Sequence, residues 1–190
     1  KILDVALSKI GDKGLFTKEL ENALLNNEVD LAVHSLKDLE TNIPQGLALA
    51  AVSKRHEVND VIIAREKGIT IDSIKIGGTV ATGSLRRRSQ LLNLRPDLHV
   101  AELRGNVPTR IQKYLDSDWD AIILARAGVE RLGLEEHISS VIPVDMMLPA
   151  VGQGALGIQI REGDTSTNEI VQCLHDNLIF AAVSAERAFL

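Results

Sequence analysis

Cysteine, aromatic residues and long apolar runs are scarce in this 190-residue sequence, and each scarcity rules out a class of protein. The single cysteine, Cys173, can form neither an internal disulfide nor a cysteine-rich metal site. With 3% aromatic residues, the core has to be built from Leu, Ile, Val and Ala. No apolar run approaches the ~20 residues that a membrane-spanning helix needs, and no signal peptide is recognisable. We therefore expect no membrane partner and a cytoplasmic location, which the lone cysteine also favours.

Basic residues are outnumbered, with 21 Lys and Arg against 26 Asp and Glu and a net charge of −5. A nucleic-acid-binding protein needs a basic surface, so we expect no nucleic-acid partner. No metal site is expected either, because the histidines show no paired ligand spacing. In such an acidic chain, a local cluster of arginines becomes informative.

The stretch from Asp30 to Asp38 joins an apolar run to four polar side chains. Leu31 to Val33 is typical of a buried strand, and the polar residues that follow are His34, Ser35, Lys37 and Asp38. A buried unpaired charge is costly, so we expect the chain to leave the sheet at His34. Lys37 and Asp38 would then reach a cleft, since ligands bind at strand ends in open α/β sheets. A solvated Lys–Asp pair at a strand end fits this stretch equally well.

Strands alternate with helices of ten or more residues, which predicts an α/β fold with mostly parallel or mixed sheets flanked by helices. A polar crossing near 53–59 and a second crossing near 148–154 divide the chain into two lobes joined by paired hinges. The first lobe is discontinuous, residues 1–55 and 150–175, and the second comprises 56–149. A cleft between two lobes is a natural ligand site.

Arginines follow three expected strands. After the first comes Thr82-Gly83-Ser84-Leu85-Arg86-Arg87-Arg88, where Ser84 can cap a helix over 84–94. The free N–H groups of a helix start favour an anion. Arginines in a first turn oppose the helix dipole, so a binding role for Arg86 and Arg87 is favoured over a solvated basic face.

The second and third strands repeat this pattern. A glycine turn, with Asn106 as a candidate helix cap, lies in Leu103-Arg104-Gly105-Asn106-Val107-Pro108-Thr109-Arg110. In the segment from Leu124 to Arg131, basic residues follow the end of a strand. The planar fork of arginine suits carboxylate or phosphate. The three strand ends therefore predict one cleft for a polyanion.

Two other features are interpreted as structural. Gly152-Gln153-Gly154-Ala155-Leu156-Gly157 has dinucleotide-site spacing but precedes a strand, so we reject that reading. Cys173 is expected to be a core residue of a helix over 167–178, followed by a second helix over 179–190.

Several long motifs follow one another along the whole chain in the order typical of the porphobilinogen deaminase (hydroxymethylbilane synthase) family, which the sequence therefore resembles. The resemblance implies two periplasmic-binding-protein-like lobes, with a third domain starting at 176–190. The motifs are Val33-His34-Ser35-Leu36-Lys37-Asp38, Ser84-Leu85-Arg86-Arg87, Leu103-Arg104-Gly105-Asn106-Val107, Ala127-Gly128-Val129-Glu130-Arg131-Leu132, Leu148-Pro149-Ala150-Val151-Gly152-Gln153-Gly154 and Ala185-Glu186-Arg187-Ala188.

The resemblance implies a transferase that condenses porphobilinogen units head to tail, with loss of ammonia, into the linear tetrapyrrole hydroxymethylbilane. Asp38 matches the catalytic aspartate, which would stabilise the cationic azafulvene formed as ammonia leaves. The substrate carries acetate and propionate groups, and the residues implied to bind their carboxylates are Arg86, Arg87, Arg104, Arg110 and Arg131. The other implied substrate- and cofactor-binding residues are Ser35, Lys37, Thr82, Ser84, Gly105, Asn106 and Gln153, with Lys9 and Lys13 on a loop covering the cleft.

The family also has a dipyrromethane cofactor, thioether-linked to a cysteine that is expected beyond Leu190, and Cys173 does not match it. Glu40 and Ala81 stand where the family usually has proline and glycine. We expect a monomer, and we expect these 190 residues alone to be inactive. The competing hypothesis is a non-catalytic two-lobed module that binds a small carboxylate ligand. Asp38 separates the two hypotheses, because a pure carboxylate-binding cleft gains nothing from a central acidic group.

Overall fold

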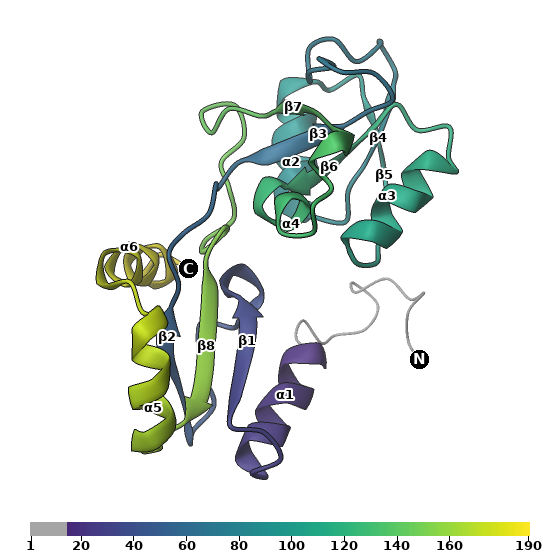
Figure 1. Cartoon of the computed structure of the whole chain (residues 1–190). Helices are drawn as coiled ribbons and strands as arrows, with labels where there is room; N and C mark the ends of the chain where they lie inside the picture. Colours follow the sequence, from purple (N-terminus) through teal and green to yellow (C-terminus); the bar gives the residue numbers. More distant parts are fainter. Residues whose placement is uncertain (1–14) are drawn as a thin grey trace. The chain divides into compact units, whose positions relative to one another are not determined.

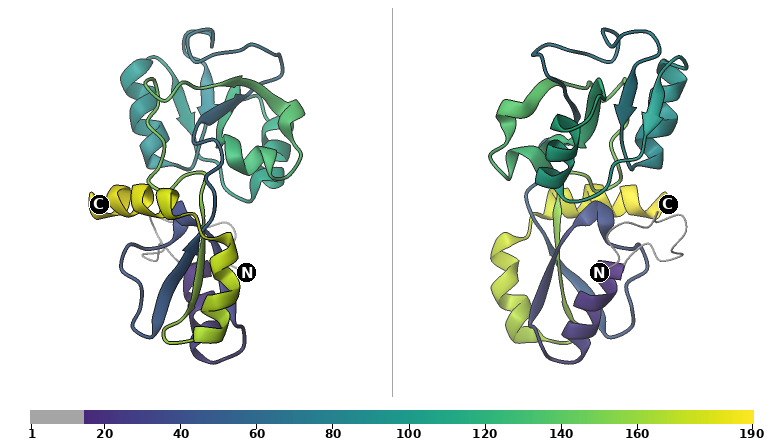
Figure 2. Two further views of the ribbon diagram at one scale, coloured as in Figure 1. Left: turned by 60° about the vertical axis from the view of Figure 1, so that its left-hand side comes forward. Right: turned by 90° about the vertical axis from the view of Figure 1, so that its right-hand side faces the viewer.

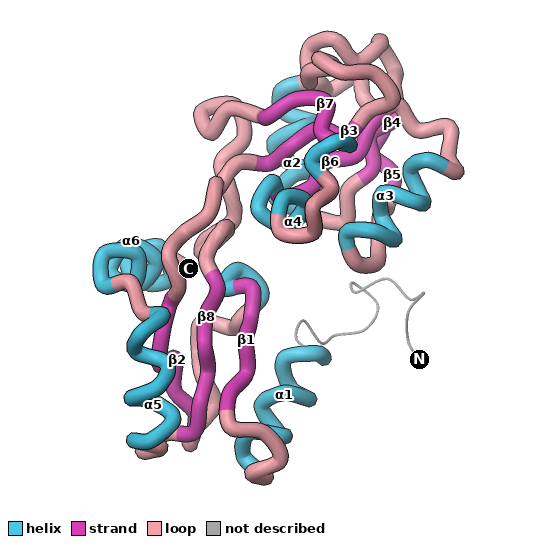
Figure 3. Tube along the Cα trace, viewed as in Figure 1, coloured by secondary structure: helices cyan, strands magenta, loops and turns pink. Residues whose placement is uncertain are grey.

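The computed structural model describes residues 15–190, which divide into two compact units (Figure 1). One, the five-stranded unit, comprises residues 57–149; the other, the three-stranded unit, comprises residues 15–56 and 150–190. The chain passes between them at 56/57 and at 149/150, and both passages are loop (Figure 3). No helix of the described residues is long and apolar enough to cross a membrane.

In the three-stranded unit, β8 lies between β1 and β2 and is antiparallel to both. A single-turn 3-10 helix, η1, follows β1 directly. Its elements are α1 (Leu15–Leu25), β1 (Leu31–Ser35), η1 (Leu36–Asp38), β2 (Leu47–Val52), β8 (Leu156–Arg161), α5 (Thr165–Val171), η3 (Gln172–Leu174) and α6 (Asn177–Ala188).

Helices α1 and α5 cover opposite faces of this sheet (Figure 2). Successive side chains of a strand point to opposite faces, so neighbours on β8 contribute to different layers. Ile158 and Ile160 pack with Val171 of α5, whereas Leu24 of α1 packs on Ala32 of β1. A third cluster, at the end where β8 begins, contains Leu36, Leu39, Val52, Ala155 and Val183.

The five-stranded unit has the strand order β5-β4-β6-β3-β7. Strand β4 is parallel to β5 and β6, and β3 is antiparallel to β6 and β7, so the sheet is mixed. Its elements are β3 (Asp60–Ile63), β4 (Thr79–Ala81), α2 (Leu85–Leu94), β5 (His99–Ala101), α3 (Val107–Leu115), β6 (Ala121–Ala125), α4 (Arg126–Glu130), η2 (Glu135–His137) and β7 (Ile138–Val141).

Both faces of this sheet are buried, which explains why β6 and the part of β3 that follows Asp60 are apolar runs without alternation. Ile62 and Ile123 pack against Leu91 of α2 on one face. Ile63 and Leu124 face the opposite cluster, to which α3 and α4 contribute Ile111, Tyr114 and Val129. The predicted α/β class, with a mixed sheet flanked by helices, is confirmed.

The C-terminal helices differ from the prediction. One helix was expected over 167–178, but α5 ends at Val171 and α6 begins at Asn177. Asp176 separates them: its side chain accepts hydrogen bonds from the N–H groups of Leu178 and Ile179, and its own N–H donates to Val52 O at 2.9 Å. The prediction that Cys173 is a core residue is wrong, because η3 places it on the exposed side. Helix α6 groups with the three-stranded unit, and a third domain starting at 176 stays a prediction.

Arg55 and Glu186 join α6 to both passages of the chain. Arg55 forms a two-pronged ion pair with Glu186, and its Nε donates to Gln153 O at 2.9 Å. The Glu186 carboxylate also accepts from the N–H of Gly152 at 2.9 Å. Burial alone would raise the pKa of Glu186, but the hydrogen bonds from Arg55 and Gly152 and the charge of Arg55 hold it below its ordinary value.

We predict that Glu186→Gln lowers the free energy of unfolding by about 2 kcal/mol at pH 7, because charge-assisted hydrogen bonds are lost. A depressed carboxyl pKa stabilises the fold above the ordinary value of 4.5 and ceases to do so as the pH falls below it. The difference between wild type and variant, measured by urea denaturation, should therefore shrink toward pH 3. Glu169→Gln, an exposed change on α5, is the control and should have no effect at either pH.

Candidate functional site

The turn that carries Lys37 and Asp38 is fixed by the residue before them. Leu36 is 1% exposed, and its N–H donates to Ala155 O at 3.0 Å. A Cβ atom on Gly152 would lie 3.1 Å from Leu36 Cγ, and one on Gly157 would lie 2.9 Å from Leu36 Cδ1. The two glycines therefore leave a hollow that the Leu36 side chain enters, and η1 is held against the start of β8.

The polar side chains of this turn remain accessible. Asp38 and Ser35 are exposed, and Lys37 is half-buried with its Nζ 3.5 Å from Oε1 of Gln153. Gln153 is itself 1% exposed. The structure thus places Gln153 beside the segment that carries Ser35, Lys37 and Asp38. All four residues were predicted from the sequence, and Gln153 lies more than a hundred positions after the other three. As predicted, the glycine-rich stretch that contains Gln153 is a turn ahead of β8 and not the start of a helix.

The five-stranded unit gathers the second set of selected residues at one edge. Because β4, β5 and β6 are parallel, their carboxyl ends share that edge. The three segments that follow these strands begin there. The segment after β4 crosses closely over the one after β5: a Cβ atom on Gly83 would lie 2.5 Å from Leu103 O. Only glycine allows this approach. The selected residues on these segments are Thr82, Ser84, Arg86, Arg87, Arg104, Gly105, Asn106, Arg110 and Arg131.

The caps of both helices at this edge are confirmed. Ser84 Oγ accepts from the N–H of Arg87 at 3.4 Å, and Asn106 Oδ1 accepts from the N–H of Thr109 at 2.9 Å. Gly105 has φ +119°, and a Cβ atom there would lie 2.8 Å from Thr109 Cγ2, so this position requires glycine. Arg110 Nε donates to Gly105 O at 2.6 Å, which brings its guanidinium back over the turn.

Arg86 and Arg87 share a carboxylate that the sequence analysis did not select. Asp60 is 0% exposed and accepts from Arg86 Nη2 at 2.6 Å and from Arg87 Nη2 at 2.8 Å. Arg87 also donates to Ile123 O at 3.2 Å, and Arg86 donates to Leu148 O. The two guanidinium groups are thus held inside the unit, with Arg87 buried and Arg86 partly exposed. That they also bind ligand carboxylates stays a prediction.

The charges in this cluster do not cancel. Burial alone would raise the pKa of Asp60, but the charges and hydrogen bonds of Arg87 and Arg86 hold it below its ordinary value. Burial also lowers the pKa of Arg86, and the Asp60 carboxylate only partly offsets that effect. Two arginines against one aspartate leave one positive charge at the start of α2. Neither arginine Nε has a hydrogen-bond partner within residues 15–190.

The other predicted arginines differ in their surroundings. Arg104 is partly exposed, and its ion pair with Glu102 is long at 3.8 Å. Arg131 is exposed just after α4. Lys9 and Lys13 lie outside the described residues. The signal for Asp60 was present in the sequence, because an aspartate that opens a fully apolar strand needs a cationic partner.

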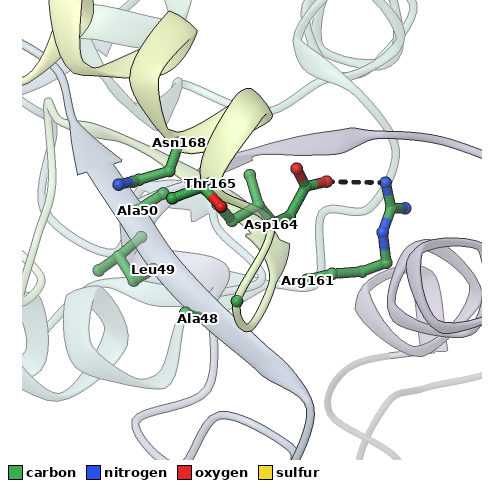
Figure 4. A pocket seen from close by; sticks show the side chains of 9 residues that line it. Ala48, Leu49, Ala50, Arg161, Asp164, Thr165 and Asn168 are labelled. Atoms are coloured by element: carbon green, nitrogen blue, oxygen red, sulfur yellow. Dashed lines mark hydrogen bonds and ion pairs between the residues drawn. The ribbon is translucent and has the colours of Figure 1, made fainter.

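A surface pocket lies elsewhere in the three-stranded unit, between β2 and the start of α5 (Figure 4). Its charged groups are already paired, since Arg161 contacts both Asp164 and Asp30 at 3.0 Å. In the strand register Arg161 ends β8, whereas Ser35 pairs with Leu156 at the beginning of that strand. The pocket therefore contains none of the selected residues.

Comparison with known proteins identifies the family. Residues 1–169 match the family model described as "Porphobilinogen deaminase, dipyromethane cofactor binding domain". The chain belongs to the porphobilinogen deaminase family. Over all its residues it is 51% identical to the porphobilinogen deaminase of Chloroherpeton thalassium, 52% identical to that of Carboxydothermus hydrogenoformans and 53% identical to that of Desulforudis audaxviator. It spans 60–61% of the length of these relatives.

Solved structures add the fold alone. A putative methionine-binding lipoprotein from Bacillus subtilis is 15% identical, with a TM-score of 0.55 over 85% of this chain and 76% of that one. A periplasmic substrate-binding protein of an ABC transporter from Coxiella burnetii is 14% identical, with a TM-score of 0.53 over 87% and 79%. The fold of this porphobilinogen deaminase family member is therefore periplasmic-binding-protein-like, as predicted.

We predict that Asp60→Asn lowers the free energy of unfolding by roughly 3–5 kcal/mol at pH 7, because the buried Arg87 and the partly exposed Arg86 lose their counter-charge. The Asp60 pKa is depressed, so its contribution is present above the ordinary carboxyl value of 3.8 and is lost as the pH falls below it. Urea denaturation at several pH values measures both effects. Asp118→Asn, an exposed change in the same unit, is the control. Equal stability of the two variants would contradict the assignment of Asp60 as the counter-charge.

Proposed function

We propose that this chain takes part in the condensation of porphobilinogen units, head to tail and with loss of ammonia, into hydroxymethylbilane. Membership of the porphobilinogen deaminase family supports the reaction and the substrate. The observation that carries the proposal is the Lys37–Asp38 turn, in which an exposed carboxylate stands on a backbone fixed by a fully buried Leu36. A catalytic group has to be both accessible and held in place.

Asp38 is the proposed catalytic residue. Each condensation breaks the bond between the aminomethyl carbon of one porphobilinogen and its nitrogen, which leaves with a proton as ammonia. A bond then forms between that carbon and the free pyrrole carbon of the preceding unit, which loses a proton. Positive charge develops on the pyrrole as ammonia departs. A fixed carboxylate that accepts a hydrogen bond from the pyrrole N–H stabilises that charge.

The strand-end residues of the five-stranded unit are the proposed carboxylate ligands. Porphobilinogen and the dipyrromethane cofactor both carry acetate and propionate groups, and guanidinium forks bind carboxylates in two-pronged fashion. The partly exposed guanidinium of Arg86 at the start of α2 fits such a group. Arg86, Arg104 and Arg110 would hold it, and the bound dipyrromethane would supply the pyrrole to which the first substrate unit adds.

Lys37 and Gln153 would bind the ligand from the three-stranded unit. The cofactor would be thioether-linked to a cysteine beyond Leu190. A monomeric state and a cytoplasmic location also stay predictions.

We predict that Asp38→Asn in the complete gene product lowers kcat by about a hundredfold or more, because electrostatic stabilisation of the developing cation is lost. The thermal midpoint should not change, since the side chain is exposed. Ammonia release from porphobilinogen measures turnover. Glu40→Gln removes the same charge two residues along on another exposed side chain and serves as the matched control. Near wild-type turnover by Asp38→Asn would refute the catalytic assignment, and no ammonia release by wild type would favour the non-catalytic binding module.

We predict that Arg104→Leu raises KM for porphobilinogen, or lowers cofactor loading, by about tenfold, as expected for one charge-assisted hydrogen bond to a carboxylate. Arg104 suits this test because its guanidinium is partly exposed and its ion pair with Glu102 is long at 3.8 Å. Steady-state kinetics and intact mass of the loaded protein give the two readouts. Arg88→Leu, the same change at an exposed position on α2, should alter neither. Identical behaviour of both variants would remove Arg104 from the site.

A further inference from the structure

Three buried polar side chains lie together between α1 and the sheet, and the proposed mechanism uses none of them. They come from three elements: Glu21 of α1 is 8% exposed, His34 of β1 is 7% exposed and Gln159 of β8 is 0% exposed. His34 Nε2 lies 3.0 Å from Gln159 Oε1, and Gln159 Nε2 donates to Glu21 Oε1 at 3.1 Å. Burying these groups is costly unless each bond is made, so their arrangement calls for a reason.

The chain of hydrogen bonds has one direction. A carboxylate can only accept, so Gln159 has to turn its NH2 group toward Glu21 and its oxygen toward His34. An amide oxygen also only accepts, so the His34 ring must carry a proton on Nε2. Glu21 therefore fixes both the amide orientation of Gln159 and the ring orientation of His34.

The network lies where β1 leads into the turn of the proposed site. His34 is one residue before the end of β1, and η1 with Lys37 and Asp38 follows Ser35 directly. On β8, Gln159 pairs with Ala32, two positions before His34 in β1. The hydrogen bonds thus join the exit of β1 to the neighbouring strand and to the helix that packs on it (Figure 1).

Apolar packing alone does not hold this end of β1. Leu36 anchors the turn from the far side of Ser35, through the hollow at Gly152 and Gly157. Three apolar side chains in place of Glu21, His34 and Gln159 would fill the same space without directional bonds. Directional bonds fix an orientation that hydrophobic contact leaves adjustable.

We infer that Glu21 and Gln159 are positioning residues, which hold His34 in one tautomer and orientation and so set the position of the Lys37–Asp38 turn. The kinetic part of this inference rests on the proposed function. The structural part concerns only the β1 end and its amides.

The first test is Gln159→Leu in the complete gene product. We expect kcat to fall by about tenfold or more, because a small misplacement of a catalytic group is costly, while KM for porphobilinogen stays within about twofold. The Leu36 amide, bonded to Ala155 O, should exchange with solvent about tenfold faster than in wild type. The amide of Ile142, bonded to Asp60 O in the other unit, is the internal reference.

The second test separates the effect of hydrogen-bond direction at Gln159 from the effect of side-chain packing. Glu21→Gln keeps a partner for Gln159 but lets the amide turn over, so the 15N spectrum of the His34 ring should change from one Nε2–H form to a mixture of tautomers. The thermal midpoint should stay close to wild type. Glu19→Gln, the same change on the exposed side of α1, should leave the spectrum and kcat as they are. His34→Gln retains an N–H donor and should recover most of the kcat that His34→Leu loses.

A wild-type His34 ring protonated on Nδ1 would overturn the inference, as would Gln159→Leu with unchanged kcat and unchanged Leu36 exchange. Equal loss of kcat in His34→Gln and His34→Leu would also overturn it, since only a bond-dependent role predicts the difference. If wild type releases no ammonia from porphobilinogen, the proposed function fails. The His34 spectrum and the Leu36 exchange rate then still decide the positioning role.

Discussion

The five-stranded unit depends on the buried charge of Asp60. An arginine in the first turn of a helix opposes the helix dipole, which costs about 0.3–1 kcal/mol. A buried carboxylate without a partner costs roughly 3–5 kcal/mol, so the need for counter-charge outweighs the dipole. Arg86 and Arg87 answer that need, and in doing so they fix α2 against the first residue of β3. Arg86 also reaches Leu148 O, so one guanidinium contacts the chain where it enters the unit and where it leaves.

The three-stranded unit holds its proposed catalytic group by shape. Asp38 has to stay exposed, so it cannot anchor its own backbone through burial. Leu36 does so, because Gly152 and Gly157 leave room for a branched side chain that any Cβ atom would displace. The position of Asp38 therefore depends on residues more than a hundred positions further along the chain. Its neighbour Lys37 reaches Gln153 in the same stretch.

Local features of the fold could be read from the sequence, and non-local pairings could not. Ser84 and Asn106 cap their helices because a cap is decided within four residues. The insertion of β8 between β1 and β2 joins segments more than a hundred residues apart, and no periodicity encodes it. Cys173 was misassigned because η3 interrupts the helical pattern on which its burial was inferred. The pairing of Asp60 is also non-local, because its partners Arg86 and Arg87 follow it by 26 and 27 residues.

The arginines at the strand ends differ in what remains for a ligand. The Asp60 carboxylate neutralises one of the two arginine charges at the start of α2, and Arg87, which pairs with it, is buried. The remaining charge, the free N–H groups of the helix start and the loosely paired Arg104 lie on adjacent segments, which Gly83 brings into contact. Within the described residues, this edge of the sheet therefore combines ion pairs that stabilise the unit with arginine side chains that are partly exposed. Arginines that look equivalent in sequence thus differ in the structure: Arg86 and Arg87 pair with a buried carboxylate, whereas Arg104 forms a long ion pair with Glu102.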